Sequence, residues 1–251
     1  MTQDRLPLAV TVAVLLSLVQ LVEGAHAEPL VVDDFSQHGS GYPAVVNYPY
    51  TFSKLDETGL TDVLGGGREM TVFSKTTVDF NPQKDHVAAD IISADGHNAL
   101  SVTATSGALP FLTLDYGAPV PEQDLKRDLS GTTAVRLVFS AINSPGNKTI
   151  GYTIKFDQDA GSTPGHVNLR GVVPTMLGEI ASNGPLTVDI PLPSPPYVGQ
   201  AGLADVDVFS VYLYPRAEGA SFQLDRIELL PEPSILLPAL LLLIRPKRRV
   251  A

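Results

Sequence analysis

Two carboxylates separated by one residue are the side chains best suited to chemistry in this chain. Asp157 and Asp159 alternate in Phe156-Asp157-Gln158-Asp159, and a loop containing glycine and proline follows. If a β-strand continues through this segment, both side chains face the same way. Two carboxyl groups about 5–9 Å apart can hydrolyse a glycosidic bond, and the Asp-x-Asp-x-Gly spacing is also typical of part of a calcium loop. A solvated strand end that enters a turn is the third interpretation, and it is the favoured one.

The other reactive residue types form no recognised catalytic arrangement. No HExxH motif that would bind zinc and no GxSxG nucleophile motif is present. The chain has no cysteine, so it forms neither disulfides nor thiolate–metal sites. The histidines occur singly, at His26, His38, His86, His97 and His166. The sequence therefore predicts a protein that is not an enzyme.

A short aromatic strip is the best candidate for ligand binding. Tyr212 and Tyr214 alternate with Val211 and Leu213, and Arg216 follows. Tyrosine combines an apolar ring with a polar hydroxyl, and sugars present C–H faces that stack on such rings, so the three residues predict a shallow saccharide platform. The alternative is structural: the two rings cover the sheet or pack beneath a loop. The absence of tryptophan argues against a strong polysaccharide binder.

The elements that position these residues are predicted to be β-strands, because the hydrophobic period is two. Apolar and polar residues alternate in each of four segments, which is typical of half-buried strands. Glycine and proline recur between the segments and indicate turns. No long segment has a helical stripe, so the fold class is all-β, a two-sheet antiparallel β-sandwich. The four segments are Asn98–Thr105, Ala134–Ile142, Tyr152–Asp157 and Phe209–Tyr214.

Three short motifs make the sandwich resemble the galactose-binding-like jelly rolls, which include many carbohydrate-binding modules. They are an early Asp33-Asp34-Phe35 strand, an Asp128-Leu129-Ser130-Gly131 turn before a central strand, and a final Leu224-Asp225-Arg226-Ile227 strand. The resemblance implies a jelly-roll domain over residues 28–230. An immunoglobulin-like sandwich is the alternative.

The same resemblance implies a structural calcium ion where the first and last strands meet. The matching positions are Asp33 or Asp34 on the first strand and Asp225 on the last. Alternation also breaks near Asp225, because Phe222 and Leu224 fall on one face while Ile227 and Leu229 fall on the other. A β-bulge at this point would turn one residue outward. The alternative is that Asp225 satisfies local backbone amides.

The glycine-rich segment Gly65-Gly66-Gly67-Arg68 predicts a tight turn before a strand. Glycine adopts positive φ without steric cost, and we expect Arg68 to pair with a carboxylate at the strand start. No Lys-Ser/Thr follows, so the segment is not a phosphate-binding loop.

The N-terminal segment predicts export. Residues 1–27 contain Arg5, the uncharged stretch Leu6–Val22 and Ala25-His26-Ala27, a pattern typical of a signal peptide cleaved after Ala27. A single N-terminal anchor helix is the alternative.

The C-terminal segment, residues 231–251, resembles the PEP-CTERM sorting signal of Gram-negative bacteria. Pro231-Glu232-Pro233 precedes the apolar stretch Ser234–Ile244, and a basic end follows at Arg245, Lys247, Arg248 and Arg249. The resemblance implies an exosortase-type processing enzyme as a partner, transient membrane association, and delivery to the cell surface or extracellular matrix. The apolar stretch contains Pro238 and is shorter than the about 20 residues that span a bilayer. A hydrophobic C-terminus of the domain is the alternative.

The net charge of the mature domain disfavours nucleic acid and other polyanions as partners. Residues 28–233 contain 12 Lys/Arg and 25 Asp/Glu, which gives 12 − 25 = −13. Such a surface repels nucleic acid and anionic lipid. The sequence thus predicts an exported, non-enzymatic surface or matrix protein that binds carbohydrate or exopolysaccharide weakly. The alternatives are a structural surface protein that contacts other proteins and, third, a glycan-acting enzyme built on Asp157 and Asp159.

Overall fold

The structure, a computed structural model, describes residues 28–38, 44–46, 51–76, 81, 85–94, 96–117, 125–159, 169–181, 183–193 and 202–232. A compact unit spans Leu30–Leu230. The predicted signal peptide, and the predicted sorting signal from Pro233 onward, lie outside the described residues. Within those residues, no helix is long and apolar enough to cross a membrane.

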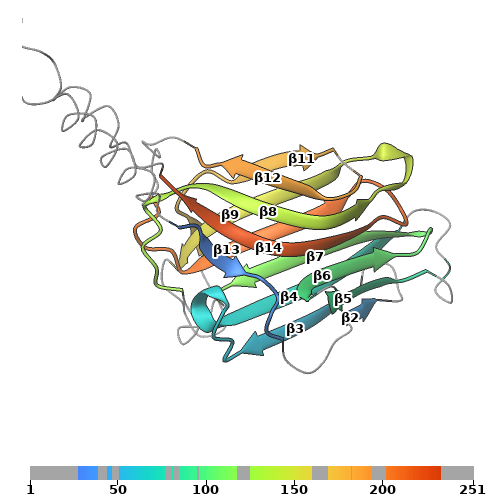
Figure 1. Ribbon diagram of the computed structural model, residues 1–251, viewed down its shortest axis with the longest axis horizontal. Helices are drawn as coiled ribbons and strands as arrows, with labels where there is room; N and C mark the ends of the chain where they lie inside the picture. The colour runs from blue at the N-terminus through green and yellow to red at the C-terminus, as the bar shows by residue number, and fades with distance from the viewer. Residues whose placement is uncertain are drawn as a thin grey trace, which may run out of the picture. The chain divides into compact units, whose positions relative to one another are not determined.

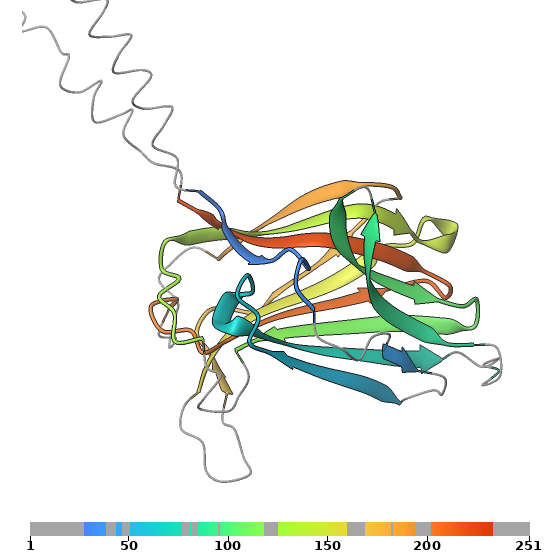
Figure 2. The same ribbon diagram turned by 60° about the horizontal axis from the view of Figure 1, so that its bottom comes forward.

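The compact unit is a sandwich of two antiparallel sheets, which confirms the predicted fold class (Figures 1 and 2). We call them sheet A and sheet B. The strands of sheet A, in spatial order, are β12 (Leu186–Pro191), β8 (Thr132–Asn143), β14 (Ser221–Pro231), β6 (His97–Ala104), β5 (Val87–Ala94) and β2 (Ala44–Val46), with β1 (Leu30–Asp33) paired to β14. Those of sheet B are β10 (Leu169–Gly171), β9 (Ile150–Asp159), β13 (Val208–Pro215), β7 (Ala108–Tyr116), β4 (Gly67–Thr76) and β3 (Phe52–Thr58), with β11 (Met176–Ile180) paired to β9.

The strand order is that of a jelly roll. From β6 onward the chain passes repeatedly between the sheets, so that β6, β14, β8 and β12 are neighbours in sheet A. Their counterparts β7, β13, β9 and β11 are neighbours in sheet B. This order, in which the first and last strands of the ribbon lie side by side in each sheet, is the double Greek key of the jelly roll. The predicted jelly roll is therefore confirmed, and all four predicted strand segments are strands.

The hydrophobic core lies between the two sheets. Alternation places one side of each strand in it, as in β7, where every second residue from Ala108 to Tyr116 is buried. Aromatic rings fill the middle of the layer: Phe139 meets Phe222 edge to face, and Phe209 packs against Phe156 with centroids 4.8 Å apart. Burial of this apolar surface is the main stabilising term of the fold, and it leaves the alternate residues of sheet B facing outward.

The break in alternation on the last strand is real. Phe222, Leu224, Ile227 and Leu229 all belong to the same core, although the two pairs differ in parity. The intervening residues, Asp225 and Arg226, lie where the neighbour of β14 changes from β6 to β1.

Candidate functional site: the outer face of sheet B

Four strands contribute one aromatic side chain each to a single row on the outer face of sheet B. Phe52 on β3 lies opposite Phe73 on β4, and Phe73 lies opposite Phe111 on β7. Tyr214 on β13 completes the row, because its ring stacks on Phe111 with centroids 6.0 Å apart and planes 13° apart. Phe73 meets Phe111 edge to face at 5.7 Å. Neighbouring strands are about 4.8 Å apart, so the row extends about 14 Å across the sheet.

Two further rows run parallel to this aromatic row (Phe52, Phe73, Phe111 and Tyr214), because alternate residues of each strand share a face. One step along the strands lies a middle row, which consists of Lys54, Thr71, Thr113, Tyr212 and Thr153. One step further lies a carboxylate row, which consists of Asp56, Glu69 and Asp115. Each row lies two residues further along the strands than the last. The outer face of sheet B therefore changes from aromatic to mainly hydroxyl-bearing to acidic over four residues of each strand.

Tyr214 is fixed in the plane of the face by several contacts. It lies over Gly151 on β9, where any Cβ atom would collide with the ring. Its hydroxyl donates a hydrogen bond to the backbone oxygen of Tyr152 at 3.2 Å. The guanidinium of Arg216 sits 4.9 Å from the ring centroid and 3.4 Å from a carboxylate oxygen of Glu179. These contacts fix the ring in one orientation, with the guanidinium over it, so little conformational freedom remains to be lost if a ligand binds.

Tyr212 lies beside it in the middle row and is also half-buried. The ammonium of Lys155 is 5.0 Å from its ring centroid. Burial raises the pKa of the Tyr212 hydroxyl, and the nearby carboxylate of Asp115 raises it further. The hydroxyl therefore remains protonated and able to donate a hydrogen bond.

The structure thus brings the three residues of the predicted platform, Tyr212, Tyr214 and Arg216, to one outer face. Sequence reasoning missed the three phenylalanines that extend the strip across the neighbouring strands. The alternation of buried and outward positions could have indicated Phe73 and Phe111, because each lies between two residues that are buried and must itself face outward. Their alignment depends on strand pairing, which one sequence does not reveal.

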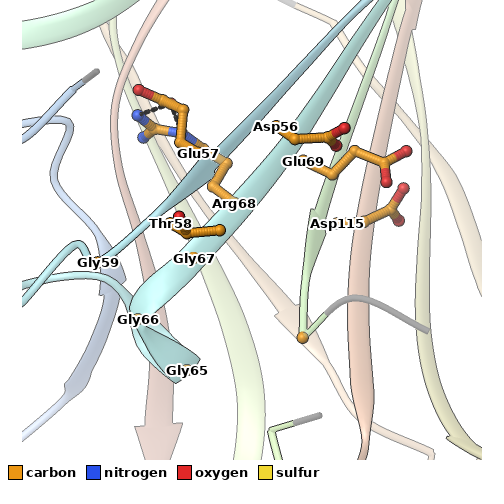
Figure 3. Close-up of a pocket in the computed structure, with 11 residues that line it drawn as sticks. Asp56, Glu57, Thr58, Gly59, Gly65, Gly66, Gly67, Arg68, Glu69 and Asp115 are labelled. Atoms are coloured by element: carbon orange, nitrogen blue, oxygen red, sulfur yellow. Dashed lines mark hydrogen bonds and ion pairs between the residues drawn. The ribbon is translucent and has the colours of Figure 1, made fainter. Parts of the chain in front are cut away.

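The carboxylate row borders a cavity of about 300 Å³ at the glycine-rich turn. Figure 3 shows the carboxylates of Glu69 and Asp115 side by side, with Asp56 next to them. Lys54 neutralises part of this charge, since its ammonium is 2.8 Å from Glu69 and 3.4 Å from Asp56. Burial raises the pKa of Asp115 to about 6, and the like charges of Glu69 and Asp157 add to the effect. A hydrogen bond from Ser210 and the charge of Lys155 oppose it.

Arg68, beyond the predicted glycine turn, belongs to a buried ion-pair cluster on the inner side. Gly65 and Gly66 adopt φ of 77° and 73°, which confirms the tight turn. The guanidinium of Arg68 binds Glu57 at 2.5 and 2.9 Å and Asp33 at 2.5 Å. Tyr116 donates a hydrogen bond to the same oxygen of Asp33 at 3.0 Å. The side chains of Arg68 and Asp33 are fully buried, so this cluster joins β1 to sheet B. Arg68 and Glu57 also line the inner side of the cavity at the glycine-rich turn.

Asp33 and Asp34, the two candidates for the calcium ligand on the first strand, have different surroundings. Asp33 is committed to Arg68, whereas Asp34 and Asp225 line one pocket of about 370 Å³ together with Ser36, His97 and Asn98. One carboxylate oxygen of Asp34 accepts a hydrogen bond from the Ser36 amide at 2.9 Å. Oxygen Oδ1 of Asp225 is buried and has no hydrogen-bond partner among the residues that the structure describes. The described residues contain no group of three or more acidic or histidine side chains arranged to hold a metal ion.

The predicted carboxylate pair is placed only in part. Asp157 faces outward on β9 and is half-buried, and burial raises the pKa of its carboxyl group. Asp159 is the last residue of β9, but its side chain lies outside the described residues.

Comparisons with known proteins give similarities of fold. No family model and no curated protein matches the sequence. Among solved structures, a family 11 carbohydrate-binding module from a cellulosomal cellulase of Clostridium thermocellum is 13% identical, with 82% of this chain and 96% of that chain covered and a TM-score of 0.43. The family 11 module from that organism in complex with a mixed-linked β-1,3-1,4 tetrasaccharide is 15% identical (81% and 95% covered, TM-score 0.42). The K2 adhesin domain of Lys-gingipain is 14% identical (80% and 96% covered, TM-score 0.34).

Proposed function

We propose that this protein is an exported, non-enzymatic surface or matrix protein that binds carbohydrate weakly through the outer face of sheet B. The aromatic row carries the proposal. Four rings in register across four strands present apolar surface to a ligand, and the neighbouring middle row supplies hydroxyl groups. A saccharide needs both, because its ring faces are apolar and its ring edges carry hydroxyls.

Weak binding follows from the shape and composition of the face. Its rings lie on a sheet surface rather than in a deep pocket, and only Phe52 is highly exposed, at 67%. A shallow site removes little ligand surface from water. We expect affinity to come from several rings that each contribute about 1 kcal/mol, so that longer oligosaccharides bind better than short ones.

A structural role in protein–protein contacts is the second candidate. Apolar side chains stand exposed near both edges of sheet B, at Phe52 and at Leu177, which is 68% exposed. Strand β3 ends the sheet on one side, and an edge strand can pair with another chain. The charged residues Lys54 and Asp56 on the same strand disfavour such pairing.

Export and sorting are proposed from the sequence of the two termini. Residues 1–27 direct export, and residues 231–251 are read at the membrane by an exosortase-type enzyme that releases the domain to the cell surface or its matrix. Replacement of Pro231, Glu232 and Pro233 by alanine is expected to leave the protein with the membrane fraction in a host that contains the processing enzyme. Unchanged release of that variant would exclude the sorting role.

Calcium at Asp34 and Asp225 remains a proposal as well. The buried oxygen of Asp225 supports it, because a buried carboxylate oxygen that finds no partner among the described residues is costly and a cation would satisfy it. The ion would be structural, since the pocket lies near sheet A and apart from the aromatic row.

Retention on immobilised polysaccharides tests the binding function. The full chain, and residues 28–232, which contain the entire core from Val32 to Leu229, are passed over a panel of uncharged bacterial and plant polymers. We expect retention that falls about tenfold or more in the Phe111→Ala/Tyr214→Ala variant, which lacks two stacking rings. Thr103→Ala, an exposed residue of β6 in sheet A, is the matched control. Equal retention of both variants, or no retention of the parent protein by any polymer, would contradict the proposal.

A further inference from the structure

The ligand class follows from the charges beside the aromatic row, provided that the proposed carbohydrate-binding function holds. The middle row lies two residues along the strands from the aromatic row, about 7 Å, and the carboxylate row lies four residues away, about 13 Å. A glycan of several sugar units that contacts the aromatic row and runs along the strands therefore passes over the middle row. Its substituents then reach toward the carboxylate row, where Glu69 and Asp115 lie directly opposite each other on β4 and β7.

Three cations near the carboxylate row and Tyr214 already interact with protein groups, and a fourth, the exposed Lys75 of β4, lies on the side of the aromatic row away from the carboxylates. Lys54 is shared between Asp56 and Glu69, and Arg216 pairs with Glu179 while it covers Tyr214. Lys155 lies over the ring of Tyr212. Each of these three cations therefore already interacts with a carboxylate or a ring of the protein, and the carboxylates Asp56, Glu69 and Asp115 outnumber the cations along their row.

We propose that the outer face of sheet B selects uncharged or amine-bearing glycans and rejects acidic ones, with Glu69 and Asp115 as the residues that impose the selection. Like charges that approach across an interface cost binding free energy and thereby suppress wrong partners. The domain charge of −13 over residues 28–233 (12 Lys/Arg and 25 Asp/Glu) acts in the same direction at longer range.

The rejection depends on pH through Asp115. The groups that face it are Glu69, Asp157, Lys155 and Tyr212, with Ser210 as its hydrogen-bond donor. Its pKa of about 6 means that it is ionised at pH 7.5 and mostly protonated at pH 5. Acidification therefore removes one negative charge from the row while a uronic acid on the ligand stays ionised.

A matched pair of polymers tests the selection. One member is an uncharged polysaccharide that the protein retains, and the other is the same polymer with its primary hydroxyls oxidised to carboxylates. The full chain is compared with Glu69→Gln/Asp115→Asn and with Asp90→Asn/Asp189→Asn, which changes the net charge equally but on sheet A. At low ionic strength, where exposed charges are least screened, we expect about tenfold weaker retention of the oxidised polymer. The ratio of the retention of the uncharged polymer to that of the oxidised polymer should fall severalfold in the sheet B variant and at pH 5. It should stay unchanged in the sheet A variant.

The outcomes separate the two proposals. If the parent protein retains both polymers equally, or if both double variants change the ratio equally, the selection by Glu69 and Asp115 is wrong while carbohydrate binding stands. If no uncharged polymer is retained, the binding function fails and the selection fails with it.

Discussion

Replacement of Asp115 by asparagine should stabilise the protein at neutral pH. Burial raises the pKa of Asp115 from 3.8 to about 6 in the folded chain. A tenfold change in proton affinity corresponds to about 1.4 kcal/mol, so ionisation of Asp115 costs the folded state about 3 kcal/mol at pH 7. Asparagine removes this cost and keeps an oxygen that accepts the hydrogen bond of Ser210.

The sign of the pH dependence follows from the same shift. Because the folded-state pKa lies above the unfolded value, the penalty is absent below about pH 4 and complete above about pH 6. The wild-type protein should therefore lose about 3 kcal/mol of stability from this group as the pH rises through that window, and Asp115→Asn should not. For a domain of this size the difference at pH 7 corresponds to a melting temperature about 6–12 °C higher.

Urea denaturation followed by far-UV circular dichroism at pH 4.5 and 7 measures the effect. Asp189→Asn is the control, because hydrogen bonds from Arg136 lower the pKa of Asp189. That exposed pair contributes at most about 1 kcal/mol, which is present at pH 7 and lost as the pH falls. The control should therefore change stability slightly and in the opposite direction. If Asp115→Asn destabilises the protein at pH 7, or leaves the difference between the two pH values unchanged, the reasoning about the carboxylate row is refuted.

Two further predictions concern the ion-pair cluster and the calcium proposal. Arg68→Met leaves Asp33 buried without its cation and should cost about 3–5 kcal/mol in urea denaturation at pH 7. Asp189→Asn weakens the exposed pair with Arg136 and should cost at most about 1 kcal/mol. Burial already raises the pKa of Asp33, so the Arg68→Met defect should shrink toward pH 4; equal costs for the two variants would contradict the cluster's role. Calcium should raise the melting temperature of the wild-type protein relative to chelator and have no effect on Asp225→Asn, and an absence of any calcium effect on the wild-type protein would exclude the ion.

The fold could be predicted from the sequence because its signals are local. Alternation in segments such as Tyr152–Asp157 reflects one buried and one outward face, and the structure forms strands in all four segments. The glycine turn before Arg68 was also predictable, since two consecutive residues with positive φ require glycine. The break in alternation at Asp225 was also visible in the sequence, because the large apolar residues change from even-numbered positions before it to odd-numbered positions after it.

The candidate site could be predicted only in part, because it depends on strand register. Tyr212 and Tyr214 share one strand, so their common face follows from spacing alone. Phe52, Phe73 and Phe111 come from three other strands and meet only when those strands pair at one particular register. The raised pKa of Asp115 likewise arises from burial and from Glu69 across the strand pair, and neither is encoded in the residues next to it.

Localisation of the ligand on the structure tests the central claim most directly. An oligosaccharide from a retained polymer is titrated into isotope-labelled residues 28–232, and amide chemical shifts are followed by NMR. The binding account predicts that the largest shifts cluster on the outer face of sheet B, at Thr71, Phe73, Phe111, Thr113 and Tyr212. Shifts that cluster instead on sheet A, or around the pocket of Asp34 and Asp225, would contradict it.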